Sequence, residues 1–264
     1  APGAPPPPRR AAGADRRRGG VPPTAGSVPV VADPGRESGA HLDVSEVSER
    51  PLQVSVHDGE LRVGYDFAGI EGLVDRARGL RDKDRAVVRV TVPASVPLKV
   101  TTARAAATVV GTRADVSVTT GTGAVRVQGV SGTASVRTAT GSVDVGEHVG
   151  DVHVTTASGT VTLGGTLGRV SVSTVTSGVE VVARESTPLV DARTVSGDVA
   201  VRLGAGSAVN LKARSVTGKA VLDGVRLDSS AQRTTSVDHV DQHGAGGAYV
   251  SASTVSGDLT VSRG

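Results

Sequence analysis

Most of the chain after residue 98 alternates apolar and polar positions in short segments that repeat. Each segment has a V-x-V-x-T pattern, a small Ser/Thr-Gly corner, a second V-x-V pattern and a Gly-rich return, as in ASVRTATGSVDV and VHVTTASGTVTL. Alternation with a period of two predicts strands that turn one face toward a core. Similarity at a fixed short period predicts stacked repeats, in which each coil covers the apolar edge of its neighbour.

The hydroxyl that ends each V-x-V-x-T pattern gives the length of the repeat. From Thr102 onward it recurs four times at 18 residues and then at steps of 20, 21 and 39 residues. The last step is about two coils long, so we expect a divergent coil near residues 234–237. The predicted inward ladder of hydroxyls consists of Thr120, Thr138, Thr156, Thr174, Thr194, Ser215 and Thr254.

Two architectures fit this alternation, a row of antiparallel hairpins and a β-solenoid. In a solenoid, equivalent residues stack one coil away at roughly 4.8 Å, so near-identical columns are favoured. Because the columns are near-identical here, we predict an all-β, β-helix-like solenoid over residues 98–264 with 18–21 residues per coil. Sharp corners favour glycine, since a Cβ would cost conformational strain there. The predicted corner glycines are Gly123, Gly141, Gly159, Gly197, Gly218 and Gly257.

The residues before the repeats predict other kinds of segment. Residues 1–40 are rich in Ala, Pro, Gly and Arg, and we expect a disordered tail because they bury too little apolar surface. Residues 41–97 are expected to form the N-terminal cap of the solenoid. This cap would contain a hairpin with Asp58-Gly59 in its turn, and a short amphipathic helix over 70–80. The paired arginines of the tail precede no apolar stretch, so no signal peptide is predicted, and the absence of Met indicates a processed product or a fragment.

Composition and charge restrict the classes of function. The chain has no Cys, which excludes disulfides and thiolate metal sites, and three aromatic residues, too few to stack many bases or sugars. The six arginines and three acids of residues 1–40 account for the formal net charge of +3, leaving 23 basic and 23 acidic residues in the predicted fold. We therefore expect no nucleic-acid partner. No apolar run approaches the roughly 20 residues of a membrane span.

Two outward columns are where a carbohydrate-active β-helix enzyme would carry paired carboxylates. Neither column has adjacent carboxylates, so we predict no catalytic residue and a protein that is not an enzyme. The columns are Arg126, Asp144, Thr162, Glu180, Ala200 and Ser117, Ser135, His153, Ser171, Asp191, Lys212.

The segment SVDHVDQHG holds the strongest metal-like cluster, with Asp238, His239, Asp241 and His243. On an extended strand the two imidazoles would be about 13 Å apart. A polar surface segment therefore explains these residues better than a metal site does. His148 and His153 also lack partners in the pattern, and we predict no metal and no cofactor.

The units TATGSVDV, TVSGDVAV and TVSGDLTV resemble a bacterial β-strand-repeat family of adhesin-like domains, a domain of unknown function. LDVSEVSERPLQVSVHDGELRVGY and AVVRVTVPASVPLKV resemble the N-terminal region of that family, so the resemblance covers residues 41–264. It implies a solenoid, adhesion and a cell-surface or extracytoplasmic location, and it brings no catalytic residues. The residues themselves leave a cytoplasmic location open. Family members have a further strand pair where this chain is rich in Pro and Arg.

Three hypotheses of function follow. The first is a non-enzymatic adhesin-like scaffold that presents stacked polar faces to a protein or to a cell-envelope glycan. The second is a structural protein that self-assembles into homo-oligomers through open solenoid ends, with the last strand near Leu259–Arg263 as an unpaired edge. The third, least favoured, is a carbohydrate-active β-helix enzyme.

Overall fold

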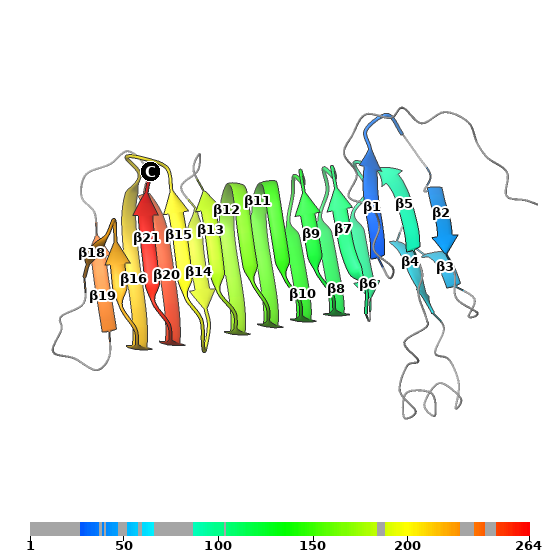
Figure 1. The fold of residues 1–264 in the computed structure, drawn as a ribbon. Helices are drawn as coiled ribbons and strands as arrows, with labels where there is room; N and C mark the ends of the chain where they lie inside the picture. Colours follow the sequence, from blue (N-terminus) through cyan, green and yellow to red (C-terminus); the bar gives the residue numbers. More distant parts are fainter. Residues whose placement is uncertain are drawn as a thin grey trace, which may run out of the picture.

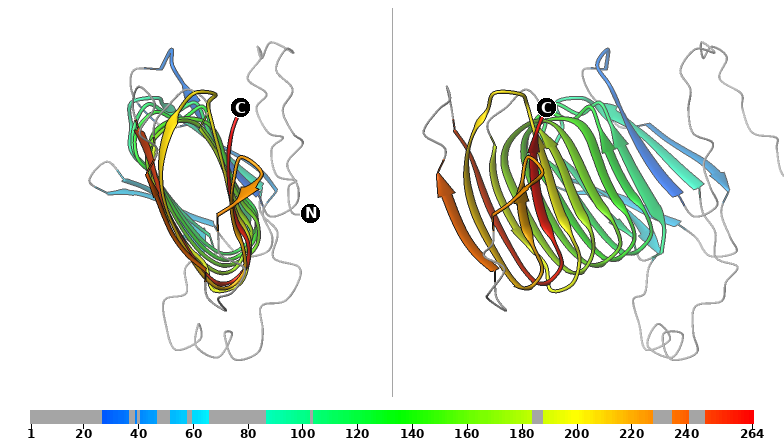
Figure 2. Two further views of the ribbon diagram at one scale, coloured as in Figure 1. Left: turned by 90° about the vertical axis from the view of Figure 1, so that its left-hand side faces the viewer. Right: turned by 60° about the vertical axis from the view of Figure 1, so that its left-hand side comes forward.

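The computed structural model describes residues 27–36, 39, 41–46, 52–57, 60–65, 87–102, 104–183, 188–227, 235–240 and 247–264. Among these residues there are only strands, turns and bends, so the prediction of an all-β fold is confirmed. The strands form one 19-stranded sheet and a separate two-stranded sheet. The large sheet winds into a stack of coils with an oval cross-section (Figures 1 and 2).

Each coil contributes a strand to two opposite walls of the oval. The first wall contains β6 (Leu98–Thr102), β8 (Val116–Thr122), β10 (Ala134–Thr140), the later parts of β11 (Val143–Ser158) and β12 (Val161–Thr176), and β14 (Leu189–Arg193). The second wall contains β7 (Ala106–Val110), β9 (Val125–Gln128), the earlier parts of β11 and β12, β13 (Val179–Ala183) and β15 (Val199–Leu203). Strands of successive coils pair in parallel, as Val118, Val136 and Val154 do. Parallel pairing between coils is the pattern of a solenoid and not of a row of hairpins.

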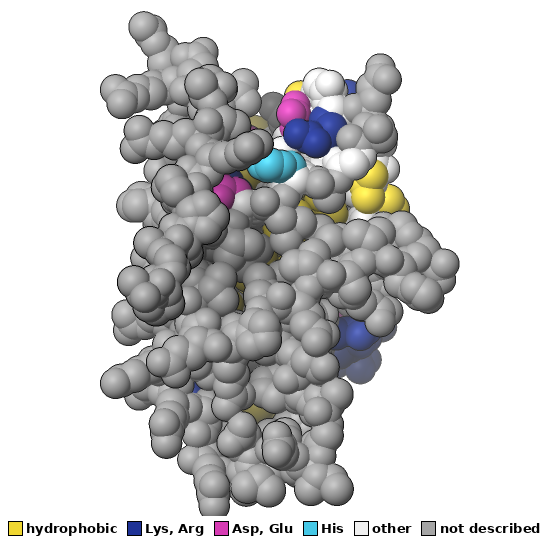
Figure 3. Space-filling model, turned by 90° about the vertical axis from the view of Figure 1, so that its right-hand side faces the viewer, with side chains coloured by type: hydrophobic (Ala, Val, Ile, Leu, Met, Phe, Trp, Pro, Cys, Tyr) yellow, Lys and Arg dark blue, Asp and Glu magenta, His cyan; other side chains and the backbone are white. Residues whose placement is uncertain are grey.

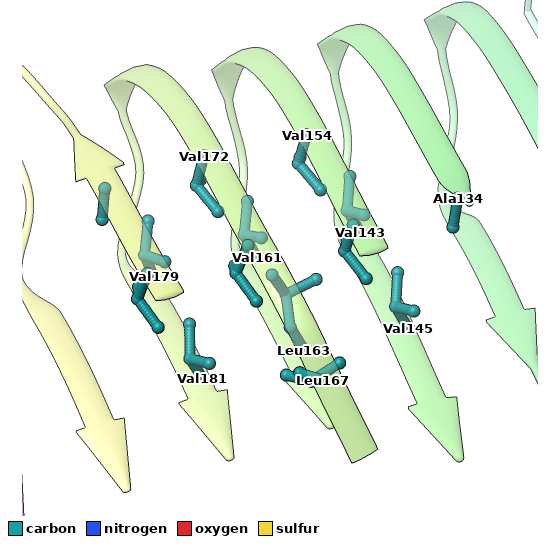
Figure 4. Close-up of a cluster of buried hydrophobic side chains, with 14 of the residues drawn as sticks. Ala134, Val143, Val145, Val154, Val161, Leu163, Leu167, Val172, Val179 and Val181 are labelled. Atoms are coloured by element: carbon teal, nitrogen blue, oxygen red, sulfur yellow. The ribbon is translucent and has the colours of Figure 1, made fainter. Parts of the chain in front are cut away.

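Aliphatic columns fill the interior between the walls. The two columns that run from Val116 to Val190 and from Val118 to Ala192 are at most 2% exposed. Figure 4 shows two columns of the opposite wall, Val143–Val161–Val179 and Val145–Leu163–Val181. Burying each Val or Leu side chain contributes roughly 1.5–3 kcal/mol relative to leaving it in water. The core is therefore narrow and layered, and it is filled mostly by Val, Ala and Leu side chains.

The N-terminal end of the stack begins earlier in the chain than predicted. β1 (Ser27–Asp33) pairs in parallel with β5 (Val87–Pro93) on one edge and with β7 on the other. The prediction of a disordered tail over residues 1–40 is therefore wrong for Ser27–Asp33, because SVPVVAD buries Val30 and Ala32 against the core. β2 (His41–Glu46) runs antiparallel along β5. The described side chains seen from this end mix both charge signs, a histidine and hydrophobic groups (Figure 3).

The predicted hairpin is present. β3 (Leu52–His57) and β4 (Glu60–Tyr65) pair antiparallel from Leu52 with Tyr65 to His57 with Glu60, which leaves two residues for the turn. The alternation of Leu52, Val54 and Val56 on one arm matches the register of the other arm. The amphipathic helix predicted over 70–80 lies outside the described residues, and the described residues contain no helix.

The C-terminal end does not follow the order of the sequence. Its strands are β16 (Ala208–Thr217), β17 (Ala220–Leu222), β18 (Val225–Arg226), β19 (Thr235–Val240), β20 (Gly247–Ser256) and β21 (Leu259–Arg263). β20 lies between β14 and β16, and β21 lies between β15 and β17 (Figure 1). The prediction that Leu259–Arg263 forms an open edge is therefore wrong, because β21 is paired on both sides.

The divergent coil expected near residues 234–237 is not a coil. β19 instead runs antiparallel along the outer edge of β16, and β18 runs antiparallel along β17. The step of 39 residues from Ser215 to Thr254 is long because β17, β18 and β19 come between β16 and β20 in the sequence. β20 then pairs directly with β16.

Candidate functional site

The predicted hydroxyl ladder lies inside the solenoid, at the end of the first wall. All seven side chains are between 3% and 7% exposed. Thr120, Thr138, Thr156 and Thr174 stand in register on neighbouring coils. After Thr194 the ladder continues in spatial order through Thr254 and Ser215, because the C-terminal coil is inserted there. Thr235 on β19 adds one more hydroxyl, which the sequence pattern did not predict.

Hydrogen bonds satisfy this ladder only in part. Thr102 Oγ1 donates to Thr120 Oγ1 at 2.9 Å. Thr156, Ser215 and Thr235 donate to carbonyl oxygens of the corner at 3.2, 3.1 and 2.6 Å. The remaining hydroxyls have no partner among the described residues; they are Thr138, Thr174, Thr194 and Thr254.

The predicted corner glycines form a stack that follows the spatial order of the coils. A Cβ on Gly141 would overlap the carbonyl oxygen of Gly123, and one on Gly159 would overlap that of Gly141. Gly257 is related in the same way to Gly197, and Gly218 to Gly257. Gly141 also has a φ of +144°, a conformation that L side chains rarely adopt. The coil whose glycine comes one position late has Ser177 at this corner.

Beside the buried ladder, the same corner exposes two rows of uncharged side chains, which we call the corner ridge. Backbone pairing aligns the rows from coil to coil. Four exposed valines form one row, and each is 46–50% exposed. The hydroxyl row is Thr122, Thr140, Ser158, Thr176, Ser196, Ser256 and Thr217, and the valine row is Val175, Val195, Val255 and Val216.

Hydrogen bonds between coils hold this ridge in place. Ser196 N donates to Val175 O at 2.7 Å, and Ser256 N donates to Val195 O at 2.9 Å. Thr217 Oγ1 donates to Val255 O at 3.2 Å, and Thr176 Oγ1 to Ala157 O at the same distance. The hydroxyl row is therefore a fixed array with one hydroxyl per coil, roughly 4.8 Å apart, and the valine row extends along four of these coils.

The outward columns carry charges in pairs. Arg126 Nε lies 3.1 Å from Asp144 Oδ2, and Arg202 contacts Glu180 at 3.2 Å on the same wall. On the first wall Asp191 contacts Arg193 at 2.7 Å. Ser251 joins that wall between Asp191 and Lys212, because of the inserted coil. Carboxylates that face solvent beside guanidinium groups are suited to surface ion pairs more than to general acid chemistry.

The structure separates the metal-like cluster. Asp238 and His239 are successive residues of β19, and successive side chains of a strand point to opposite faces. Asp241 and His243 lie outside the described residues. Within the described part of the chain, no three His, Cys, Asp or Glu side chains form a group that could hold a metal ion.

His148 is the residue whose position the sequence pattern missed. Its side chain is fully buried at a return between the walls, where β11 shifts register against β12. Nε2 lies 3.2 Å from Asp151 O, and Nδ1 has no partner among the described residues. Burial lowers the pKa of His148 below its ordinary value of 6.5, against the opposing effect of nearby carbonyl groups and the Asp151 carboxylate.

No helix of the described residues is long and apolar enough to cross a membrane.

Comparison with protein families agrees with the resemblance of the repeats. Among solved structures, a protein from Clostridium sporogenes described as a "putative cell adhesion protein" is similar at 12% identity and a TM-score of 0.27, over 90% of this chain and 88% of that chain. A likeness at that score carries no argument about function. No curated protein matches. Residues 51–262 match Toastrack DUF4097, a domain of unknown function, over most of the chain. The chain belongs to the Toastrack DUF4097 family.

Proposed function

We propose that this protein is a non-enzymatic, adhesin-like scaffold whose corner ridge binds an extended cell-envelope glycan. The observation that carries the proposal is the alignment of seven hydroxyls, six of them exposed and Ser158 half-buried, with a row of four exposed valines over successive coils. A rod that offers a hydroxyl in every coil, beside a valine in four of the coils, suits a ligand that is itself repetitive.

The chemistry of the ridge favours sugars. Ser and Thr hydroxyls both donate and accept hydrogen bonds, which matches the hydroxyls of a glycan. Valine methyl groups supply apolar contact for the C–H faces of sugar rings, in a chain with few aromatic residues. A row of four partly exposed valines is also an apolar strip of the kind that marks interaction surfaces.

The non-enzymatic part of the proposal is supported by the outward carboxylates. Asp144 and Glu180 each contact an arginine and are 39% and 38% exposed, unlike a buried general acid. Cleavage of a uronic-acid polysaccharide by the purified chain, lost on Asp144→Asn or Glu180→Gln, would overturn this part.

The test is cosedimentation of the purified chain with peptidoglycan sacculi. We expect binding that weakens about tenfold in the Val195→Asn/Val255→Asn variant, because the apolar strip is interrupted at its centre. The matched control is Val225→Asn/Val240→Asn, since both valines are 62% exposed and lie outside the ridge. Absence of binding, or equal weakening in both variants, would contradict the proposal.

A further inference from the structure

The last coil of the chain occupies a slot between two coils that precede it in sequence. β20 pairs with β14 from Tyr249 to Ser253 and with β16 from Gly247 to Ser256. β21 pairs with β15 along Leu259–Arg263 and with β17 along Leu259–Val261. Figure 2 shows this coil inside the stack, with other strands beyond it. The coils on either side of the slot are consecutive in the chain and are joined only by the turn from Gly204 to Ser207.

The slot matches the inserted coil in shape and in hydrogen bonding. The inward side chains of the coil are at most 4% exposed, namely Ala248, Val250, Ala252, Thr254, Leu259 and Val261. Backbone bonds reach both sides, as from Val199 N to Asp258 O and from Leu259 N to Lys219 O, at 2.9 and 2.8 Å. The coil is therefore held in the same manner as any coil in the middle of the stack.

Two aspartates bind across the slot in series. Asp198 Oδ1 accepts from Asp258 N at 2.8 Å, and Asp258 Oδ1 accepts from Lys219 N at 3.0 Å. At the end of the coil, Arg263 Nε donates to Asp223 Oδ2 at 2.7 Å. The bonds made by the Asp258 carboxylate and the Arg263 side chain depend on the identity of the inserted residues, so the slot recognises these two side chains in addition to the strand backbone.

The flanking coils would also fit each other without the insert. Val190 and Leu211 both align with Val250, and Ala192 and Ala213 both align with Ala252. The register that joins the flanking coils to the insert is thus the register in which they would stack directly. The chain can therefore fold through a stack in sequence order, and the insert occupies a site that exists only when the flanking coils are apart.

We propose that this slot is a binding site for the C-terminal coil Gly247–Gly264 of a second copy of the chain. Every contact described above joins residues that are remote in sequence, so a coil from another molecule makes the same contacts. In dilute solution the chain's own coil is favoured by its tethering, and a second molecule competes at high concentration or during refolding. The result is a dimer, or a longer series, joined by exchanged coils. This inference is independent of what the corner ridge binds.

Engineered disulfides test the proposal directly, because the chain has no cysteine. Ala200 and Thr260 are paired on the second wall, away from the corner ridge. Paired parallel neighbours lie roughly 4.8 Å apart, within the Cα separations that disulfides span. One chain carries Ala200→Cys and the other carries Thr260→Cys. The two chains are mixed, refolded together at high concentration and oxidised.

The matched control is a mixture of Glu180→Cys and Ala200→Cys chains. These residues are paired in the same way between β13 and β15, but outside the slot. We expect about fivefold more disulfide-linked heterodimer from the Ala200/Thr260 mixture than from the control. Equal yields in the two mixtures, whether both are low or both are high, would overturn the proposal, since then no exchange is specific to the slot.

A single chain with both Ala200→Cys and Thr260→Cys tests the slot itself. We expect an intrachain disulfide in dilute solution, and loss of concentration-dependent dimers after it forms. Failure of the intrachain disulfide to form in a folded chain would overturn the proposal, because the C-terminal coil would then not lie beside β15.

Discussion

The coils from β8 to β13 and the coils from β14 to β21 are built from the same columns, yet only the first group stacks in sequence order. In the first group, Val118, Val136, Val154 and Val172 are neighbours in both sequence and space. In the second, Val250 lies between Val190 and Leu211. Both arrangements bury aliphatic residues and align the corner. The repeat pattern thus specifies what a coil is, and it leaves open which coil lies beside which.

The difference has its physical origin at the ends of the stack. A last coil in sequence order would present a row of unpaired backbone groups, which is a liability in solution. Here the outermost wall positions belong to the antiparallel strands β18 and β19, which pair with β17 and β16. The regular C-terminal coil is placed inside, where both of its edges are paired. In this arrangement the antiparallel strands β18 and β19 cover the end of the stack, and the regular repeats lie in its interior.

The largest expected effect comes from breaking the glycine stack in the regular part. In Gly141→Ala the new Cβ would overlap Gly123 O, and the residue has a φ of +144°. We expect the free energy of unfolding to fall by about 3 kcal/mol, measured by urea denaturation. Gly206→Ala is the control, because its φ of +79° is similarly unusual for Ala but no atom lies within 4 Å. We expect a loss of about 1 kcal/mol there. Equal losses in the free energy of unfolding would show that the close contact between coils adds nothing to the cost of a Cβ at Gly141.

Amide hydrogen exchange compares the inserted coil with its cover. β20 is paired on both edges and buries Val250, whereas β19 is half-exposed and pairs with β16. We expect amides of β20 to exchange as slowly as those of β10, and at least about tenfold more slowly than those of β19. Exchange that is faster in β20 than in β19 would indicate that the last coil lies at the end of the stack, as its place in the sequence suggests.

Most of the coil geometry follows from the sequence, and most of the order does not. The hairpin of Leu52 and Tyr65 and the columns through Val118 follow from alternation and turn chemistry, which are local signals. The place of Val250 cannot be predicted from the sequence, because Val190 and Leu211 both align with Val250 and could equally align with each other. β1 is missed because the average composition of residues 1–40 hides the alternation of Val30 and Ala32. The corner ridge needs the true coil order, since only then do Val195, Val255 and Val216 become adjacent.

A buried histidine in the regular part gives the fold a pH dependence. Burial lowers the pKa of His148 in the folded state, so below its ordinary pKa of 6.5 the unfolded chain binds more protons than the folded chain. The contribution is fully present above pH 6.5 and is lost as pH falls from 6.5 toward the lowered pKa. We expect His148→Gln to flatten the decline of stability as the pH falls below 6.5, measured by thermal or urea unfolding. His153→Gln, on the outward face of the first wall, is the control. If this variant flattened the dependence of stability on pH equally, the buried His148 would not be its cause.

The smallest effect distinguishes an ion pair within the regular part from one that closes the C-terminal end. Arg126 and Asp144 form a solvent-facing pair whose side chains are 50% and 39% exposed, so Arg126→Ala is expected to cost at most about 0.5 kcal/mol. Arg263 is less exposed and contacts Asp223 through both Nε and its backbone N–H, at 2.7 and 2.8 Å. Arg263→Ala removes only the side-chain part of this clamp, and we expect a loss of about 1 kcal/mol. Urea unfolding of both variants, with exchange rates of the β21 amides, measures the difference. If Arg263→Ala costs no more than Arg126→Ala, pairing of β21 with β15 and β17 alone holds the inserted coil, and the clamp is dispensable.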